Sequence, residues 1–274
     1  MTDLATLAVA VLSAAEASEK TALAREAARL WRQSEGAMAV GFSAPPDRPA
    51  RPARPDLLPP AAMPRRRGYT EKARAALLHA VQHIELNAID LAFDMIARFT
   101  DADLPRAFYD DWVRVGEEEA LHFTLLAGRM AELGYQYGDF PAHDGLWEAA
   151  VATQRDLTAR LAVVPMVLEA RGLDVTPAMI DRFARIGDEK SVIILNRILT
   201  DEITHVATGN RWFQYICARE NIEPRATWQR LVQKNFKGLL KPPFNSAARD
   251  RAGLPEDYYV PLAAPLPALK PENG

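Results

Sequence analysis

The sequence predicts an all-α protein: a four-helix bundle with an extra N-terminal helix and Pro-rich extended segments. Apolar residues recur three and four positions apart over long stretches, as they do on the buried face of a helix. Glycine, proline and capping residues divide this pattern into segments of bundle length. No stretch shows the apolar and polar alternation that is typical of a half-buried strand. We therefore expect a core built from helices alone.

The chain begins with a segment that predicts one helix over residues 3–34. It is rich in alanine and in apolar residues at helical spacing, and it contains no glycine or proline before Gly36. From 43 to 64 the composition changes to prolines with interspersed arginines, and the basic run 65–67 follows. This composition predicts an extended strap, because proline lacks the amide hydrogen that a helix interior needs.

Four core helices are expected over roughly 70–99, 105–133, 146–186 with an interruption, and 188–219. The segment 100–105 combines a helix stop with a helix start, and Gly187 followed by Asp188 is typical of a C-terminal glycine and an N-cap. The connection between residues 134 and 165 leaves two possibilities. Either Pro165 kinks the third helix, or the first part of that helix belongs to the crossover.

The end of the chain is again rich in proline from Leu239 onward, which predicts a segment that wraps the bundle or is mobile at its end. Together these patterns predict an N-terminal helical extension (1–42), a Pro/Arg-rich strap (43–68), the helix bundle (69–220) and a C-terminal Pro-rich wrap and tail (221–274).

Composition places the chain among ordinary globular proteins, with 274 residues, 49% apolar and 25% charged. A net charge of −3 gives no overall basic field for nucleic acid or an anionic membrane. One cysteine, Cys217, excludes an internal disulfide and fits a reducing compartment. The apolar segment 4–15 lacks the preceding basic residues of a signal peptide, and no run is long enough to span a membrane. We expect a cytoplasmic protein.

Three of the predicted core helices carry polar ligand-type residues within an otherwise apolar face. Glu85 does so on the first, Glu119 and His122 on the second, and Glu202 and His205 on the fourth. A buried, unpaired carboxylate costs several kcal/mol, so a core that contains one must neutralise, pair or metallate it. Each Glu-x-x-His places its two side chains on adjacent turns of one face, where both can bind one ion.

The spacing of these residues predicts that they meet at one level. Glu119 follows Glu85 by 34 residues and Glu202 follows Glu169 by 33, so one pattern occurs twice. The midpoints of the two intervals, residue 102 and residues 185–186, fall in the predicted turns. Two such hairpins bring four carboxylates and two imidazoles together, and four carboxylates balance two divalent cations. The predicted metal ligands are Glu85, Glu119, His122, Glu169, Glu202 and His205, and the predicted cofactors are two iron ions, with manganese possible.

Two further carboxylates are expected to support the histidines. Asp201 lies four residues before His205, and Glu118 lies four before His122. At this spacing each can reach the distal ring nitrogen of the histidine on its own helix and fix its tautomer.

The ligand pattern resembles the ferritin-like di-iron carboxylate proteins, in which two helices give one Glu each and two give Glu-x-x-His. The stretches His-Ile-Glu-Leu-Asn-Ala-Ile-Asp (83–90), Leu-Glu-Ala-Arg-Gly-Leu-Asp (168–174), Asp-Glu-Ile-Thr-His-Val (201–206) and Lys-Pro-Pro-Phe-Asn (241–245) resemble an uncharacterised bacterial family of ferritin-like proteins, domain of unknown function 455. This resemblance covers about residues 45–265. It implies a fold and a metal site but no substrate.

A second resemblance concerns the residues around Glu169, where Leu-Glu-Ala-Arg is similar to the tRNA-modifying non-haem di-iron hydroxylase. Members that generate a stable radical carry a tyrosine one turn beyond the first histidine, and here Leu126 occupies that position, which excludes such a radical. Arg48, Arg51, Arg54 and the run 65–67 could contact RNA phosphates, although such arginines more often pair with a bundle's own acids.

Several residues have plainer alternative interpretations. Glu117 and Glu118 beside Glu119 form a charge run, which is usually a solvated face. His79 and His83 lie off the Glu85 stripe and are expected to be surface or packing histidines. His143, in the loop, is either a lid residue or an ordinary loop histidine.

The function that these observations favour is an oxygen-dependent oxidase or hydroxylase that acts on a small-molecule or RNA substrate of unknown identity with an external electron donor. The alternatives are a ferroxidase or metal-binding protein without an organic substrate, and a structural bundle with a vestigial site. We expect a monomer or homodimer.

Overall fold

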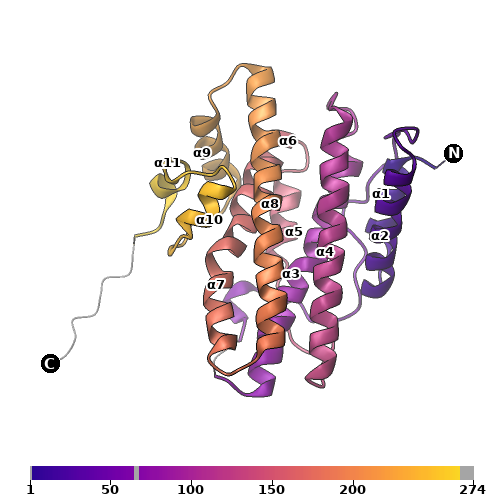
Figure 1. Cartoon of the computed structure of the whole chain (residues 1–274). Helices are drawn as coiled ribbons and strands as arrows, with labels where there is room; N and C mark the ends of the chain where they lie inside the picture. The colour runs from indigo at the N-terminus through magenta and orange to yellow at the C-terminus, as the bar shows by residue number, and fades with distance from the viewer. Residues whose placement is uncertain (1, 65–67, 266–274) are drawn as a thin grey trace.

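The computed structural model describes residues 2–64 and 68–265, in which helices account for the regular structure and no strand longer than an isolated bridge occurs (Figure 1). This confirms the all-α prediction. The helices are α1 Leu4–Ser13, α2 Ala17–Gln33, α3 Glu71–Arg98, α4 Arg106–Glu132, α5 Gly145–Ala152, α6 Leu157–Val163, the π-helical segment η2 Val164–Glu169, α7 Ala170–Ala184, α8 Glu189–Glu220, α9 Pro224–Asn235, α10 Ser246–Arg251 and α11 Glu256–Tyr259, with the 3-10 turns η1 Pro60–Ala62 and η3 Val260–Leu262.

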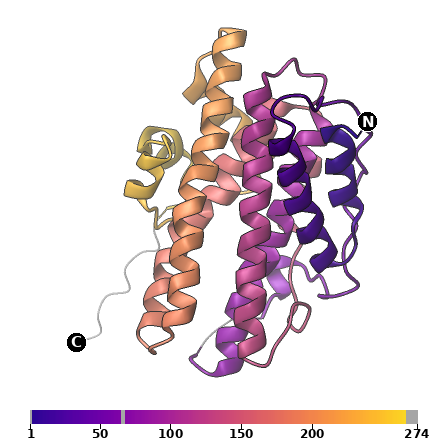
Figure 2. The ribbon, with the colours of Figure 1, turned by 45° about the vertical axis from the view of Figure 1, so that its right-hand side comes forward.

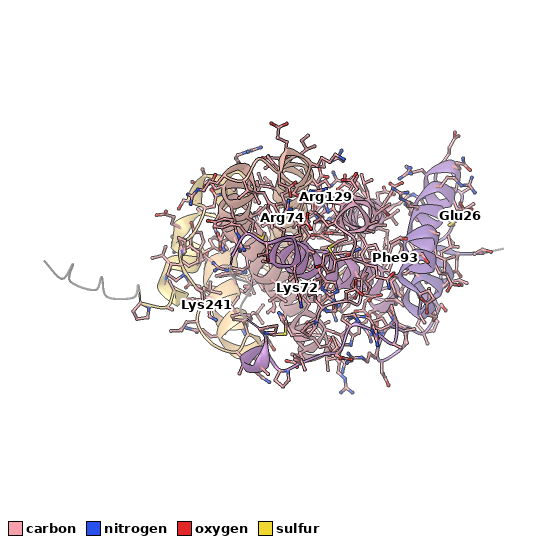
Figure 3. All side chains as sticks on the ribbon, turned by 90° about the horizontal axis from the view of Figure 1, so that it is seen from below. Glu26, Lys72, Arg74, Phe93, Arg129 and Lys241 are labelled. Carbon is pink, nitrogen blue, oxygen red and sulfur yellow. The ribbon has the colours of Figure 1, made fainter. Side chains whose placement is uncertain are left out.

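Two helical hairpins form the bundle: α3 packs against α4, α7 packs against α8, and α4 contacts α8 between them (Figure 1). One end of the bundle is filled by apolar side chains from all four helices: Ala75, Leu78, Val81, Leu126, Met130, Phe183, Leu195 and Ile198. Asp188 closes this end. It caps α8 by accepting from Ser191 N, and it lies 2.9 Å from a guanidinium nitrogen of both Arg74 and Arg129. The two arginines lie close together in the view from below (Figure 3).

The third predicted core helix, over 146–186, is not one continuous α-helix, and two features interrupt it. Its predicted first part is a separate helix, α5, which belongs to the crossover and packs between α3 and the π-helical segment. The second part is interrupted at Pro165, where Val164–Glu169 winds as a π-helix because proline cannot donate the helical hydrogen bond. The first part of the predicted helix therefore belongs to the crossover, and Pro165 lies where the α-helical winding of the second part is interrupted.

The N-terminal extension also differs from the prediction, because the expected helix over 3–34 is broken into α1 and α2 at Ala14. Lys20 gives the physical reason. Its ammonium donates to the carbonyl oxygens of Val11 and Leu12 at the end of α1, and it lies 2.6 Å from Asp90 of α3. A continuous helix would use those carbonyls internally and would leave the fully buried ammonium without them.

The strap lies against the bundle through its arginines. Arg51 is 3.0 Å from Asp90, and Arg48 pairs with Asp144. These two arginines therefore bind the protein's own acids, which was the more common of the expected roles. The basic run 65–67 lies outside the described residues.

The C-terminal segment is more helical than its proline content indicates, since α9, α10 and α11 precede the residues beyond 265 that the structure does not describe. It covers the side of the bundle opposite to α1 and α2 (Figures 1 and 2), and Lys241 and Glu26 mark these two sides in Figure 3. Within the described ranges, no helix combines the length and the apolar character needed to cross a membrane.

Candidate metal centre

Glu119 lies at the middle of the buried polar group and is fully shielded from solvent. Its Oε1 is 2.9 Å from Nδ1 of His205, and its Oε2 is 3.3 Å from Nδ1 of His122. The two imidazole rings are 5.8 Å apart between centroids. One carboxylate of α4 therefore faces the Nδ1 atoms of both histidines.

The other carboxylates surround Glu119. Glu85 Oε2 is 3.2 Å from Nδ1 of His122, and Glu202 Oε2 is 3.9 Å from Nδ1 of His205. Ligand atoms of Glu85, Glu119, His122 and Glu202 all lie within 4.8 Å of one another. This buried group of carboxylates and histidines can bind a metal ion.

Glu169 ends the π-helical segment and joins the same electrostatic group without being part of its tightest cluster. Its charge interacts with Glu119 and His205, and its Oε2 has no hydrogen-bond partner among the described residues. Glu169 and Glu202 are also the most exposed of the six predicted ligands, at 9% and 7%. The group therefore approaches solvent on the side of α7 and α8.

The supporting carboxylates pair across the helices, which corrects the expected pairing within each helix. Nε2 of His122 on α4 is 2.9 Å from Asp201 of α8, and Nε2 of His205 on α8 is 2.8 Å from Glu118 of α4. With both Nδ1 atoms turned toward Glu119, each Nε2 points across to the neighbouring helix. A carboxylate four positions earlier on the same helix lies one turn along the axis instead.

This hydrogen bonding determines which ring nitrogen is available to a cation. A carboxylate at Nε2 keeps the proton on that nitrogen, so Nδ1, which faces the interior of the group, is the nitrogen that a cation would bind. Although burial raises the pKa of Asp201, its hydrogen bonds with His122 and Arg197 hold that pKa below the usual value. Asp201 is therefore a permanent acceptor for His122.

The raised pKa values of three carboxyl groups show that the buried group of carboxylates and histidines needs positive charge. Burial, together with the charge of Glu119, raises the pKa of Glu85 to about 8 and that of Glu169 to about 7. Burial and Glu119 also raise the pKa of Glu202. In the absence of a cation, protons supply this charge, and a metal ion that binds here must displace them.

Burial lowers the pKa of both histidines, but their carboxylate neighbours outweigh it. Hydrogen bonds with Asp201, Glu119 and Glu85 raise the pKa of His122, and Glu119 and Glu118 raise that of His205 well above its usual value. Without a metal ion, both rings therefore hold a second proton, and a metal ion would displace it from Nδ1.

Gly209, one turn after His205, allows this packing, and it was not among the predicted site residues. A side chain at this position would place its Cβ 2.3 Å from Pro165. A Cβ at Gly172, three residues after Glu169, would meet Glu202 at an ordinary contact distance of 4.0 Å, so that position does not require glycine. A glycine at helical spacing from a ligand was the available signal.

His79 and His83 are packing histidines rather than surface ones, and both are buried. His83 lies between Tyr137 Oη, 2.8 Å from Nδ1, and the carbonyl of His143, 3.2 Å from Nε2. Burial and the nearby Arg51 lower the pKa of His83 to about 3, so the ring is neutral. His143 itself accepts from the amide of Gly145 in the crossover loop.

Comparison with known proteins places the chain in one family. The model of a protein family described as "Protein of unknown function (DUF455)" matches residues 13–260. The chain belongs to the DUF455 family. A relative from Haemophilus influenzae, described as "Uncharacterized protein", is 44% identical over 207 residues, which cover 74% of this chain and 72% of the relative. No solved structure matches the chain. All six predicted ligands lie inside the DUF455 region.

Proposed function

We propose that Glu85, Glu119, His122, Glu169, Glu202 and His205 hold two iron ions, and that the protein is an oxygen-dependent oxidase or hydroxylase of the ferritin-like di-iron superfamily. The observation that carries this proposal is the orientation of the two histidines. Both rings direct Nδ1 to Glu119 while a carboxylate of the opposite helix holds Nε2. This is the second-sphere arrangement that metal-binding histidines use.

The donor set supports iron. Four carboxylates and two imidazoles suit iron and manganese, and their charge balances two divalent ions. Carboxylate oxygens without a partner support occupancy, because Glu169 Oε2 and Glu202 Oε2 have no hydrogen-bond partner among the described residues. Leaving these atoms buried without a ligand would cost several kcal/mol.

The residues divide into two sides around Glu119. Glu85 and His122 would hold one ion, and Glu169, Glu202 and His205 the other, with Glu119 between them. Two ferrous ions in this position would supply the electrons that reduce oxygen. Glu118 and Asp201 keep a proton on each Nε2, and the burial of the group limits access of water to the ions.

The arrangement of the outer helices favours an enzyme over an iron store. A storage cage needs free bundle faces for assembly, whereas α1 and α2 cover one side of this bundle and α9 to α11 cover the other (Figure 2). A small-molecule substrate is favoured over RNA, because Arg48 and Arg51 already pair with Asp144 and Asp90. We propose a cytoplasmic monomer or dimer with an external electron donor.

The first experiment measures metal content and oxygen use together. After expression with added iron, elemental analysis should give about two irons per chain, and the reduced protein should consume oxygen in a limited number of turnovers unless substrate and reductant are present. Manganese in place of iron would change the identity of the metal but not the assignment of the site. Absence of any transition metal would refute the site, and hundreds of irons retained per chain in a large assembly would show storage instead.

The second experiment replaces one carboxylate by its amide. Glu119→Gln keeps the shape of the side chain but removes the charge shared by both histidines, so we expect the bound metal to fall to less than half. Glu117→Gln on the same helix is the matched control, since Glu117 is paired with Arg32 at the surface. Equal metal content in the two variants would remove Glu119 from the site.

A further inference from the structure

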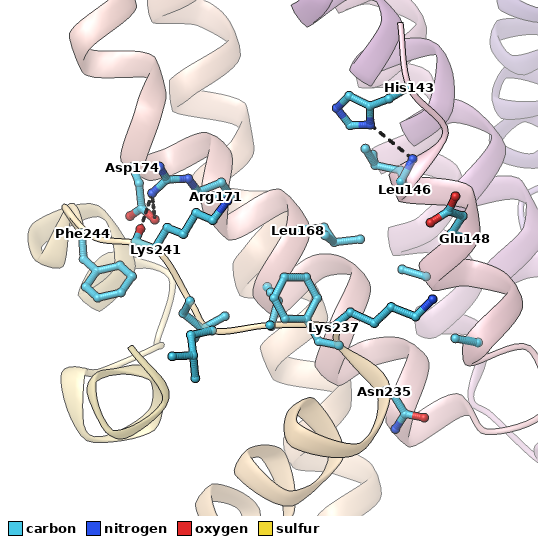
Figure 4. Close-up of a pocket in the computed structure, with 18 of the residues that line it drawn as sticks. His143, Leu146, Glu148, Leu168, Arg171, Asp174, Asn235, Lys237, Lys241 and Phe244 are labelled. Atoms are coloured by element: carbon cyan, nitrogen blue, oxygen red, sulfur yellow. Dashed lines mark hydrogen bonds and ion pairs between the residues drawn. The ribbon is translucent and has the colours of Figure 1, made fainter. Parts of the chain in front are cut away.

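A pocket of about 660 Å³ lies between α5, the π-helical segment and the loop from α9 to α10 (Figure 4). Its volume is in the range of small-molecule sites. None of the six predicted metal ligands lines it. Val167, Leu168, Arg171 and Asp174 do, and at helical spacing these residues lie on the face opposite to Glu169. The pocket is therefore a second site, separated from the candidate metal centre by one helix.

Most of the pocket wall is apolar. The floor is formed by small and aliphatic side chains of α5 and the π-helical segment, and Phe236 and Phe244 of the loop lie at its sides. Leu239 of the same loop lines the pocket while 53% of its surface is exposed. An apolar ligand in the pocket would shield the exposed side chain of Leu239 from water.

One charged group in the wall, Arg249, has a donor that no described residue uses. Arg249 is only 3% exposed, and its guanidinium lies near the rings of Phe244 and Tyr259, with centroid distances of 5.0 and 4.4 Å. Its Nε and Nη2 donate to Asp174 at 2.8 and 2.7 Å. Nη1 has no hydrogen-bond partner among the described residues, so one buried donor of the fork is left for a ligand.

Basic side chains outnumber acidic ones at the rim of the pocket. Lys237 and Lys241 line the pocket and are exposed, and Lys237 extends across it in Figure 4. Arg171 donates to the carbonyl oxygens of Lys241 and Pro243 and so holds the loop in place. Of the two acids in the wall, Asp174 already pairs with Arg249, which leaves Glu148 opposite several cations.

We propose that this pocket binds an organic anion with an apolar body and one carboxylate or phosphate head group. The apolar body lies along α5 and the π-helical segment, and the head group accepts from Nη1 of Arg249, with the charges of Lys237 and Lys241 at the rim of the pocket. The proposal does not depend on the metal centre, because no residue is shared between the two sites.

Calorimetric titration of the full-length protein tests it with four probes: octanoate, octyl phosphate, octanol and inorganic phosphate. We expect saturable binding of an octyl anion, with octanol and inorganic phosphate at least tenfold weaker. The stronger of the two anions identifies the head group. Equal binding of octanol, or equal binding of inorganic phosphate, would overturn the proposal, as would no saturable binding of either octyl anion.

Three variants locate the binding. Lys241→Gln and Lys237→Gln should each weaken the octyl anion by about two- to fivefold, the effect of an exposed ion pair. Arg249→Lys keeps a charge beside Asp174 but removes the fork, so we expect at least about a tenfold loss. Lys234→Gln, exposed on α9 outside the pocket, should have no effect. Unchanged binding in all three pocket variants would place the anion elsewhere, and Glu119→Gln should bind it normally.

Discussion

Each histidine of the candidate metal centre receives its supporting carboxylate from the opposite helix. His122 of α4 depends on Asp201 of α8, and His205 of α8 depends on Glu118 of α4. These hydrogen bonds connect the two hairpins at the level of the site, since neither hairpin contains both a histidine and the carboxylate that binds its Nε2. Loss of one carboxylate should therefore affect the histidine on the other helix.

Asp201→Asn tests this pairing across the two helices. We expect metal affinity to fall about 10- to 100-fold, the usual effect of removing a carboxylate behind a ligating histidine. In nitrogen NMR of the zinc-loaded protein with labelled histidine, the ring of His122 should shift more than that of His205. Glu118→Gln should give the reverse pattern. A shift confined to His205 in the Asp201 variant would restore the pairing within one helix.

The sequence contained the register of the predicted ligands but not the directions of their side chains. Intervals of 34 residues from Glu85 to Glu119 and 33 from Glu169 to Glu202 predicted that these residues meet at one level, and ligand atoms of Glu85, Glu119 and Glu202 lie within 4.8 Å of one another. The partner of Asp201 could not be predicted, because it depends on how far α4 and α8 are rotated about their axes. Sequence spacing gives the turn on which a residue lies, and packing decides what it faces.

The π-helical segment is the element that carries Glu169, whose charge interacts with Glu119 and His205. Pro165 begins it by removing a helical hydrogen bond, and Gly209 of α8 makes room for the proline ring. The proline in the sequence indicated an irregularity at this point, but two outcomes were compatible with it. Only the close approach of Gly209 to Pro165 shows how α8 accommodates the wider turn.

Gly209→Ala should destabilise the protein by about 1–3 kcal/mol, because its Cβ would overlap the rigid ring of Pro165. Displacement of the π-helical segment should also lower metal content. Gly128→Ala on α4 is the matched control: it meets no atom within 4 Å and should stabilise by about 0.5–1 kcal/mol. Denaturant unfolding measures the free energy of unfolding of both variants. Equal stability of the two alanine variants would mean that α8 and the π-helical segment are not in tight contact.

The break between α1 and α2 is an element boundary without a local signal, since Ala14, Ala15 and Glu16 are all compatible with a helix. Lys20, which stabilises the break, pairs with Asp90 of α3, 70 residues away. A sequence window around Ala14 contains no information on that contact. Tertiary pairing of a buried charge overrides the local helix propensity here.

Lys20→Met should therefore destabilise the protein by about 3–5 kcal/mol, because Asp90 would lose a partner at a site with no solvent exposure. Arg29→Met on the same helix removes an exposed pair with Glu26 and should leave the stability almost unchanged. Thermal or denaturant unfolding compares the stabilities of the Lys20→Met and Arg29→Met variants. A small effect of Lys20→Met would show that Arg51 alone neutralises Asp90.

At the scale of the whole molecule, the carboxylates of the site oppose folding when no cation is present. The folded protein holds the pKa of Glu85 at about 8 and that of Glu169 at about 7, and the ordinary value in an unfolded chain is 4.5. The histidine pKa values are raised as well. Between pH 5 and 8 the folded state therefore binds more protons than the unfolded state, and its stability falls as pH rises.

Metal binding should reverse this trend. A divalent ion displaces the same protons, so its affinity increases with pH, and its stabilisation increases with affinity. Calorimetric melting from pH 5.5 to 8 should show the metal-free protein losing on the order of a few kcal/mol. The zinc- or manganese-loaded protein should hold or gain stability over the same range, so the gap between the two midpoints widens with pH.

The double variant Glu85→Gln/Glu169→Gln provides the control for this experiment. It removes two carboxyl groups whose pKa values are raised, so the metal-free form should lose much of its pH dependence and become more stable than the metal-free wild type at pH 8. It should also bind metal weakly, because the ions would lose one carboxylate on each side of Glu119. A metal-free wild type that gains stability from pH 5.5 to 8 would contradict the raised pKa values. The buried carboxylates would then be stabilised by the protein alone, and the strongest physical reason for a cation at this site would be gone.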